Sequence, residues 1–449
     1  MEFLSQKKKQ RPGYLSRLLL LCLACLSLGC PKSTEVLGES GSANAPSQWL
    51  TEDLVYDSNI KTVQFYRNPF EGSYPVLKLN GSSQLVLEFD EWISQDLRET
   101  DFTVDIINCD ADWRQTYVLP IEFYEGFVQD RITEWERSEF TKVDYVHYRY
   151  AFPQENERFK MSGNYLLKVY RNNNPNQVVL TRRFIVANPR QPITSTYQLQ
   201  KRVERLRLSE LGFQVNTSGL NVFNPARDLK VMLLQNFRWD NAMHLQQARF
   251  FRDNKLEYLI NLNTAFNGGN EFRILDIRST RFHSIGMQEV EENESNYTVF
   301  LYPDKARLNN TFSAIMDRNG SFIVGVQEWP NEDYQADYLS NIFTLQASEP
   351  YPNAEVYLFG RFTDWQCQPE YKLSYRPELE RYEADVSLKQ GIYDYAYVIK
   401  RPGSLPVDEQ SLEGQRLDNE NFYTVLVYFK GPTDRTHQLI GYQPFNYFD

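Results

Sequence analysis

The sequence contains Tyr165-Leu166-Leu167-Lys168-Val169-Tyr170, then the polar run Arg171-Asn172-Asn173-Asn174-Pro175, and then Thr181-Arg182-Arg183-Phe184-Ile185-Val186. In both outer segments apolar residues recur at alternate positions, which places them on one face of an extended strand. Asn and Pro between them favour a turn. The stretch therefore predicts two half-buried strands of an antiparallel sheet.

The same alternation recurs on both sides of this stretch. Turn-forming residues such as Asn80-Gly81 and Ser162-Gly163-Asn164 separate the segments. Further strands are predicted at residues 61–66, 85–89, 102–107, 210–215, 229–235, 271–276, 297–302 and 321–328. A few short helices are expected, for example near residues 122–129 and 242–250. The pattern predicts an all-β protein of tandem immunoglobulin-like β-sandwich domains.

Pro-containing runs suggest where one domain ends and the next begins. Ala187-Asn188-Pro189-Arg190-Gln191-Pro192 and Ser348-Glu349-Pro350-Tyr351-Pro352 are the two predicted linkers. The expected domains are a first sandwich at residues 50–190, a second at 191–346 and a third at 347–449. Gly163-Asn164-Tyr165 and Gly391-Ile392-Tyr393 each place a Gly and a Tyr at the start of a strand, as in a late strand of immunoglobulin-like sandwiches.

The N-terminus has the composition of an export signal. A basic region spans residues 7–17, and an apolar run of 11 residues, Leu18 to Leu28, follows it. That run is shorter than the roughly 20 residues that cross a bilayer, so residues 1–29 are predicted to be a lipoprotein signal peptide. Cys30 follows Gly29 directly and is the predicted lipidation site. There are two alternatives to lipidation at Cys30. The signal could be an ordinary cleaved one in which Cys30 is incidental, or processing could occur at Cys25. Residues 30–49 are expected to form a flexible tether.

The charge of the chain excludes two classes of partner. Its formal net charge is −11, and five of its Lys and Arg residues lie within the first 17 positions. Such an acidic body argues against nucleic-acid binding and against binding to anionic lipid surfaces through its charge. Membrane association is therefore expected through the lipid anchor alone.

Neither Cys nor His has the spacing of a catalytic or metal site. Beyond the signal and Cys30 only Cys109 and Cys367 remain, and both are expected to be free thiols. The sequence shows no enzyme signature. Its four histidines are scattered, and it contains no G-x-S-x-G elbow, no H-E-x-x-H helix and no phosphate-binding loop. The chain is predicted to be non-enzymatic, without metal or cofactor.

Two polar strings have both a functional and a structural interpretation. Asp110 and Asp112 could be calcium or acid–base carboxylates, but one Asp-x-Asp lacks the further oxygen ligands of calcium, so a turn capped by Trp113 is preferred. Arg238 and Trp239 could form a partner-binding hot spot, because such sites are rich in Arg and Trp. Equally, Trp239 could close the end of its own sandwich with Arg238 stacked on it.

Several strings occurring in one order resemble the plug protein family of the type IX secretion system, from about residue 50 to the C-terminus. They are Ile60-Lys61-Thr62-Val63-Gln64-Phe65-Tyr66-Arg67-Asn68, Ser73-Tyr74-Pro75, Asn108-Cys109-Asp110-Ala111-Asp112-Trp113, Ser162 to Tyr165, Leu180 to Phe184, Gln235 to Asn241, Gly268 to Phe272 and Leu439 to Tyr442. The resemblance implies a periplasmic protein without catalytic residues. It also implies a partner, the outer-membrane β-barrel of the translocon, which the protein seals when no substrate passes.

The third module has a second resemblance. Val356 to Trp365 and Gly391 to Tyr397 are similar to early-set sandwiches that bind glycogen, in which an exposed Trp stacks on sugar rings. Arg381-Tyr382 stands where a second Trp is expected. Trp365 is therefore predicted to pack within the protein, and a carbohydrate-binding surface or periplasmic lipoprotein is the alternative function.

Overall fold

The computed structural model describes residues 50–93, 99–188, 193–203, 206–261, 266, 270–307, 317–403, 407–414 and 421–445. Its described part is nearly all β, which confirms the predicted fold class. The signal peptide, Cys30 and the tether lie outside the described residues. None of the described helices has the length and apolar character that a membrane crossing needs.

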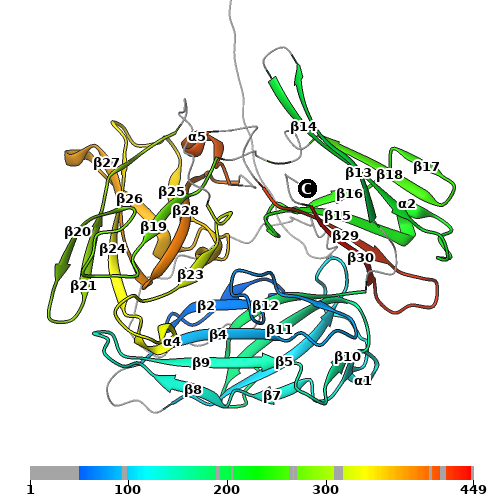
Figure 1. Ribbon diagram of the computed structural model, residues 1–449, viewed down its shortest axis with the longest axis horizontal. Coiled ribbons are helices and arrows are strands. Elements are labelled where there is room, and N and C mark those ends of the chain that lie inside the picture. The colour runs from blue at the N-terminus through cyan, green and yellow to red at the C-terminus, as the bar shows by residue number, and fades with distance from the viewer. Residues whose placement is uncertain are drawn as a thin grey trace, which may run out of the picture. The chain divides into compact units, whose positions relative to one another are not determined.

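The first sandwich packs two sheets around one core (Figure 1). One sheet has the order β1 (Leu54–Val55), β12 (Val178–Ala187), β11 (Gly163–Arg171), β5 (Phe102–Cys109), β7 (Gln129–Arg131), with β3 (Val76–Lys78) parallel to β12. The other has the order β2 (Ile60–Arg67), β4 (Leu85–Trp92), β9 (Tyr145–Phe152), β8 (Glu134–Arg137). The connection between β5 and β7 contains α1 (Pro120–Phe123) and β6 (Tyr124–Glu125), which pairs with β10 (Arg158–Phe159).

The second sandwich is made from two separate parts of the chain. One sheet has the order β13 (Ile193–Val203), β14 (Leu206–Asn216), β18 (Lys255–Asn261), β17 (Phe250–Arg252). The facing sheet has the order β16 (Met243–Leu245), β15 (Leu229–Gln235), β29 (Tyr423–Phe429), β30 (Gln438–Phe445), and α2 (Pro225–Asp228) precedes β15. Residues of β14, β15 and β29 share one hydrophobic core.

The third sandwich lies between these two parts in sequence and forms one sheet of ten strands. The order is β19 (Arg273–Asp276), β28 (Gly391–Lys400), β25 (Glu355–Phe359), β26 (Lys372–Arg376), β27 (Arg381–Lys389), β24 (Tyr338–Gln346), β21 (Tyr297–Leu301), β20 (Met287–Glu292), with β22 (Asp304–Lys305) on β24 and β23 (Phe322–Val324) on β28. β26 pairs with both β25 and β27, so it joins the two halves that share a core. The short helices are α4 (Glu332–Gln335), α5 (Gln410–Glu413), η1 (Arg361–Thr363), η2 (Pro369–Tyr371) and η3 (Pro377–Leu379).

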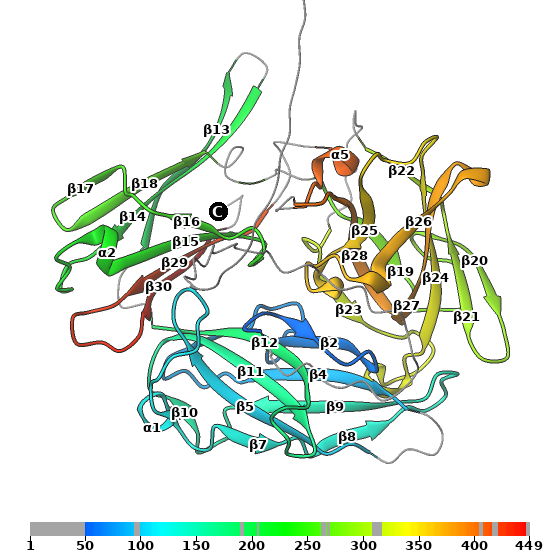
Figure 2. The same cartoon turned by 180° about the vertical axis from the view of Figure 1, so that it is seen from behind.

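Strand pairing crosses the predicted boundary between residues 346 and 347 in two ways. The run 348–352 connects β24 and β25, which belong to the same ten-stranded sheet, instead of separating two domains. β29 pairs with β15 along its full length, so the last strands return to the second sandwich (Figure 2). The helix expected near 122–129 is wrong in part, because α1 ends at Phe123. The helix expected near 242–250 is wrong, because residues 243–245 form β16 and none of residues 242–250 is helical.

The first and third sandwiches share a tyrosine corner at the two strand starts where the sequence places a Gly and a Tyr. Tyr165 Oη donates a hydrogen bond to the Met161 carbonyl at 2.7 Å, and Tyr393 Oη donates to the Lys389 carbonyl at 2.7 Å. Both tyrosines are buried at the start of a strand, β11 and β28. This bond satisfies a buried hydroxyl while it fixes the turn into the strand.

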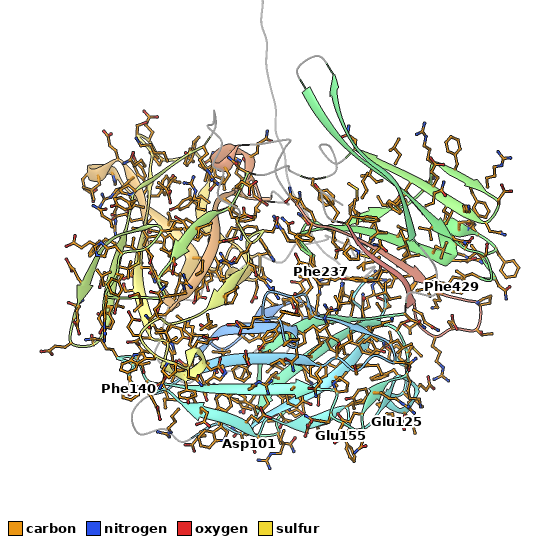
Figure 3. All side chains as sticks on the ribbon, viewed as in Figure 1. Asp101, Glu125, Phe140, Glu155, Phe237 and Phe429 are labelled. Atoms are coloured by element: carbon orange, nitrogen blue, oxygen red, sulfur yellow. The ribbon has the colours of Figure 1, made fainter. Side chains whose placement is uncertain are left out.

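A further hydrophobic cluster joins the first sandwich to the second. It combines residues of β11 and β12 with residues of β15, β29 and β30, and Phe237 belongs to it (Figure 3). Because apolar area buried between sheets stabilises their contact, this cluster holds the two sandwiches together.

Candidate functional site at the junction of the sandwiches

Arg238 lies at the junction of the second and third sandwiches and is almost fully buried, with 3% of its surface exposed. Its guanidinium donates to the Asp240 carboxylate at 3.0 and 2.7 Å and to Glu409 Oε1 at 2.8 Å. The same group stacks between Phe359 and Trp365, at 5.0 and 4.5 Å from the ring centroids. Burial alone would lower the pKa of Arg238, but Glu409 and Asp240 hold this pKa above its usual range.

Trp239 packs inside the protein as well. It meets Trp113 edge to face at 4.8 Å and Phe237 at 5.8 Å, and the Arg183 guanidinium lies 5.9 Å from its ring. These contacts fit the structural interpretation, in which Arg238 and Trp239 both pack within the protein. Arg238, however, stacks on Trp365 and not on Trp239. Neither residue presents a large free surface to a partner.

Trp365 is the residue that a sugar-binding module would expose. It contacts Phe359 and Phe272 at centroid distances of 5.5 and 5.9 Å, in addition to Arg238. Trp365 thus packs against protein groups, as the sequence predicted, while part of it lines the cavity described below. It is not the fully exposed Trp that a sugar-binding module presents.

A cavity of about 540 Å³ lies where the three sandwiches meet. Its charged lining comes from all of them: Glu52, Asp53, Arg182 and Arg183 from the first sandwich, Asp240 from the second, and Arg361, Asp364 and Lys400 from the third. Among these described charges, Arg182 and Asp364 pair across the junction.

Two arginines show how that pairing links the sandwiches. Arg182 lies 3.2 Å from Asp364, and Arg361 Nη2 donates to the Phe65 carbonyl at 2.9 Å. Burial raises the pKa of Asp364 to about 6, although Arg182 acts in the opposite direction. The cavity is thus a polar seam between domains.

The cavity does not have the groups of an active site. Cys367, at its wall, has a pKa raised to about 11 by burial, so its thiol is protonated at neutral pH. No histidine is among the described residues that line it. A nucleophile paired with a base is therefore not assembled by these residues.

The Asp-x-Asp string forms the predicted turn. Asp110 Oδ1 accepts hydrogen bonds from the backbone N–H groups of Asp112 and Arg114 at 2.8 and 3.0 Å. Asp112 pairs with Lys230 of the second sandwich, and Trp113 is buried in the cluster between the sandwiches. Cys109 and Cys367 are both free, as expected.

Sequence analysis missed a buried polar network between the first and third sandwiches. Asp90, on β4, accepts hydrogen bonds from Lys389 Nζ at 2.6 Å and Tyr338 Oη at 2.7 Å, and it lies 2.8 Å from His147 Nδ1. In sequence, Asp90 alternates with apolar residues and resembles a solvent-facing position. Only the covering third sandwich shows that this face of β4 is buried. Glu88, His147 and Asp333, beside this network, are the described residues that could hold a metal.

An exposed apolar surface lies on the first sandwich around α1. Tyr117, Leu119, Ile121 and Phe127 are 99%, 55%, 73% and 81% exposed, and we call them the 117–127 surface. Clustered exposed aromatic and aliphatic side chains of this kind are typical of binding surfaces.

Comparison with known proteins finds a family model that matches part of the chain. Residues 60–188 match the family model of the type 9 secretion system plug protein 1st domain, which confirms the resemblance over this part of the chain. A crystal structure of a hypothetical protein from Parabacteroides merdae is similar, with a TM-score of 0.82 and 29% sequence identity over 89% of this chain and 100% of that one.

Two other comparisons contribute nothing to function. A crystal structure of a Salmonella alpha-2-macroglobulin mutant covers 87% of this chain and 24% of that one at 10% identity, and its TM-score of 0.14 supports no argument. No curated protein matches the chain.

Proposed function

We propose that this protein is a non-enzymatic periplasmic plug subunit that seals the outer-membrane translocon barrel of the type IX secretion system when no substrate passes. The observation on which the proposal depends is the match of residues 60–188 to the first domain of that plug family. The described cavity contributes no catalytic pair that would favour an enzyme instead.

The junction between the three sandwiches fits this role, because a plug must stay rigid and wide while it blocks the barrel. Three sandwiches are joined by a hydrophobic cluster, by Arg238 and by the charged seam of the cavity. Interdomain contacts made only of exposed polar groups would allow domain motion, whereas buried apolar area and buried ion pairs oppose it.

We place the barrel contact on the 117–127 surface, because it lies within the matched domain and exposes apolar side chains that a partner would cover. Tyr and Phe are enriched at protein interfaces, and a surface of this limited size suits a contact that must also be released.

The experiment compares two sets of surface variants in cells with an intact translocon. One variant changes Tyr117, Leu119, Ile121 and Phe127 to Ser. The matched control changes Phe250 and Phe251 to Ser; these residues are 56% and 53% exposed and lie outside the matched domain. We expect the first variant to lose co-purification with the barrel and to admit large antibiotics, and the control to do neither.

Deletion of the whole gene completes the test. Deletion of the gene should make the outer membrane permeable to large dyes only when the barrel is present. Unchanged permeability, together with no co-purification of the unaltered protein with the barrel, would exclude the plug function. Retained co-purification of the 117–127 variant would exclude only the assigned surface.

A further inference from the structure

One face of the β4–β9 pair places four polar side chains side by side. Glu88 and Asp90 alternate along β4, and their cross-strand partners on β9 are Arg149 and His147. The opposite face of the same strands holds core residues, among them Phe89 and Tyr148. Because side chains of a strand alternate between faces, the four polar groups point together toward α4 and the third sandwich.

The environment of His147 fixes which ring nitrogen has the proton. Nδ1 lies 2.8 Å from Asp90 Oδ1, and a carboxylate can only accept, so Nδ1–H donates. Because Nδ1 is bonded to Asp90, Nε2 is the ring nitrogen that points away from Asp90.

That nitrogen has no hydrogen-bond partner among the described residues. His147 is 8% exposed, and its Nε2 is fully buried. A buried polar atom without a partner costs free energy, roughly 1–3 kcal/mol, so an unfilled position beside Nε2 is unfavourable. Nε2 is therefore available to a ligand.

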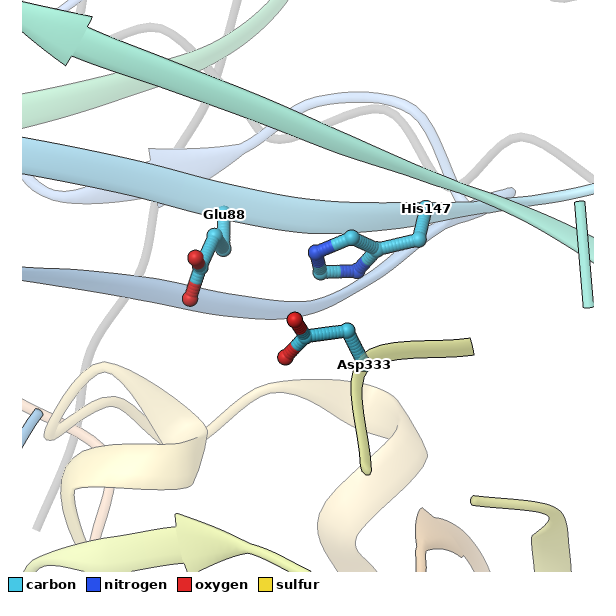
Figure 4. A group of neighbouring side chains, drawn as sticks. All are labelled: Glu88, His147 and Asp333. Carbon is cyan, nitrogen blue, oxygen red and sulfur yellow. The ribbon is translucent and has the colours of Figure 1, made fainter. Parts of the chain in front are cut away.

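Two carboxylates face the same position (Figure 4). One ring nitrogen of His147 and one oxygen each of Glu88 and Asp333 lie within 4.8 Å of one another. Two ligand atoms of a tetrahedral zinc site, with bonds of about 2.1 Å, lie about 3.4 Å apart. The three side chains would therefore have to move together by up to about 1.4 Å to bind one ion.

Hydrogen bonds fix the backbone of Asp333 and the carboxylate of Glu88. Asp333 N donates to the Asn331 side chain at 3.0 Å, and the Asp333 carbonyl accepts from Lys389 Nζ at 2.6 Å, so α4 fixes the backbone of this residue. Glu88 accepts from Tyr66 Oη at 2.9 Å and lies 3.2 Å from Arg149 Nε. Each carboxylate oxygen can accept more than one bond, so these contacts leave coordination possible.

From this arrangement we propose that Glu88, His147 and Asp333 bind a divalent transition-metal ion that joins the first sandwich to the third. One imidazole and two carboxylates suit zinc and its neighbours better than calcium, which prefers six to eight oxygen ligands. The Asp90 carboxylate behind His147 is the outer-shell partner that metal-binding histidines usually have. The site would exist whether or not the protein seals a barrel.

The test uses the full-length mature protein, stripped with a chelator and titrated with Zn²⁺, Mn²⁺ and Ca²⁺ by calorimetry. One Zn²⁺ per chain and a rise in melting temperature are expected, because a ligand that binds only the folded state stabilises it. Asp333→Asn and His147→Gln should each weaken Zn²⁺ binding at least tenfold. His244→Gln, at an exposed histidine on β16, should not.

Three results would overturn the proposal. The stripped protein could fail to bind Zn²⁺, the Asp333→Asn and His147→Gln variants could bind it as tightly as the unaltered protein, or Ca²⁺ could bind more tightly than Zn²⁺. Asp333 is half-buried on a short helix, so Asp333→Asn remains informative if His147→Gln does not fold.

Discussion

Lys389 Nζ lies 2.6 Å from Asp90 Oδ2, and both side chains are only 1% exposed. The two residues come from β27 and β4, so the pair joins the third sandwich to the first. Because both ions are desolvated, each depends on the other for its charge to be tolerated inside the protein.

We expect Lys389→Met to lower the free energy of unfolding by about 3–5 kcal/mol, since it leaves Asp90 buried without its ammonium partner. The matched control is Lys61→Met. Lys61 pairs with Glu370 at 2.8 Å across the same two sandwiches, but these side chains are 19% and 45% exposed. Exposed pairs contribute about 0–1 kcal/mol. Guanidinium unfolding of both variants would measure the difference, and equal losses would contradict the assignment.

Arg238 provides a test of packing against binding. We expect Arg238→Met to destabilise the protein by at least about 3 kcal/mol, because Glu409 and Asp240 lose their shared cation. Arg252→Met is the control, since Arg252 and its partner Asp253 are 89% and 82% exposed. Thermal unfolding should shift for the first variant alone. A variant that kept its stability but lost a partner would support the hot-spot hypothesis instead.

Asp364 should give the junction a dependence on pH. Its pKa is raised to about 6 in the folded protein, so the folded state binds this proton more tightly than the unfolded state does. The stability that the neutral carboxyl contributes is complete below about pH 4 and is lost as the pH rises through 6. Relative to Asp364→Asn, the unaltered protein should lose on the order of 2–3 kcal/mol between pH 4 and 7. Parallel stability curves for the two proteins over this range would show that Asp364 does not titrate there.

Cys30 remains a prediction from the sequence. Mass spectrometry of the mature protein from membranes should find acyl chains on Cys30 at the new N-terminus, and Cys30→Ser should release the protein from the membrane fraction. Cys25→Ser is the control that distinguishes the alternative processing site. An unmodified N-terminus beyond residue 30 would show that the signal is an ordinary cleaved one.

The sequence predicted local structure well because alternation is a property of neighbouring residues. β15 lies at the predicted residues 229–235, and Asp110 forms the predicted turn. Strand partners are set by contacts across long stretches of chain, so β29 could not be assigned to β15 from pattern alone. The burial of Asp90 was missed for the same reason, since Asp90 is covered by another sandwich, and the contact of Arg238 with Glu409 and Trp365 of the third sandwich was not predicted.

The pairing of β15 with β29 also determines the order in which the protein can be completed. The first sandwich and the third are each built from one continuous stretch, so each can fold as soon as its own residues have emerged during synthesis. The second sandwich must wait until the whole third sandwich and then residues 423–445 have emerged, and until then β15 pairs with β16 but lacks its other neighbour, β29. The half-built sheet of the second sandwich therefore exposes an unpaired strand edge for the longest time during synthesis. A chain cut short after residue 414 would lose the second sandwich while it kept every strand of the third.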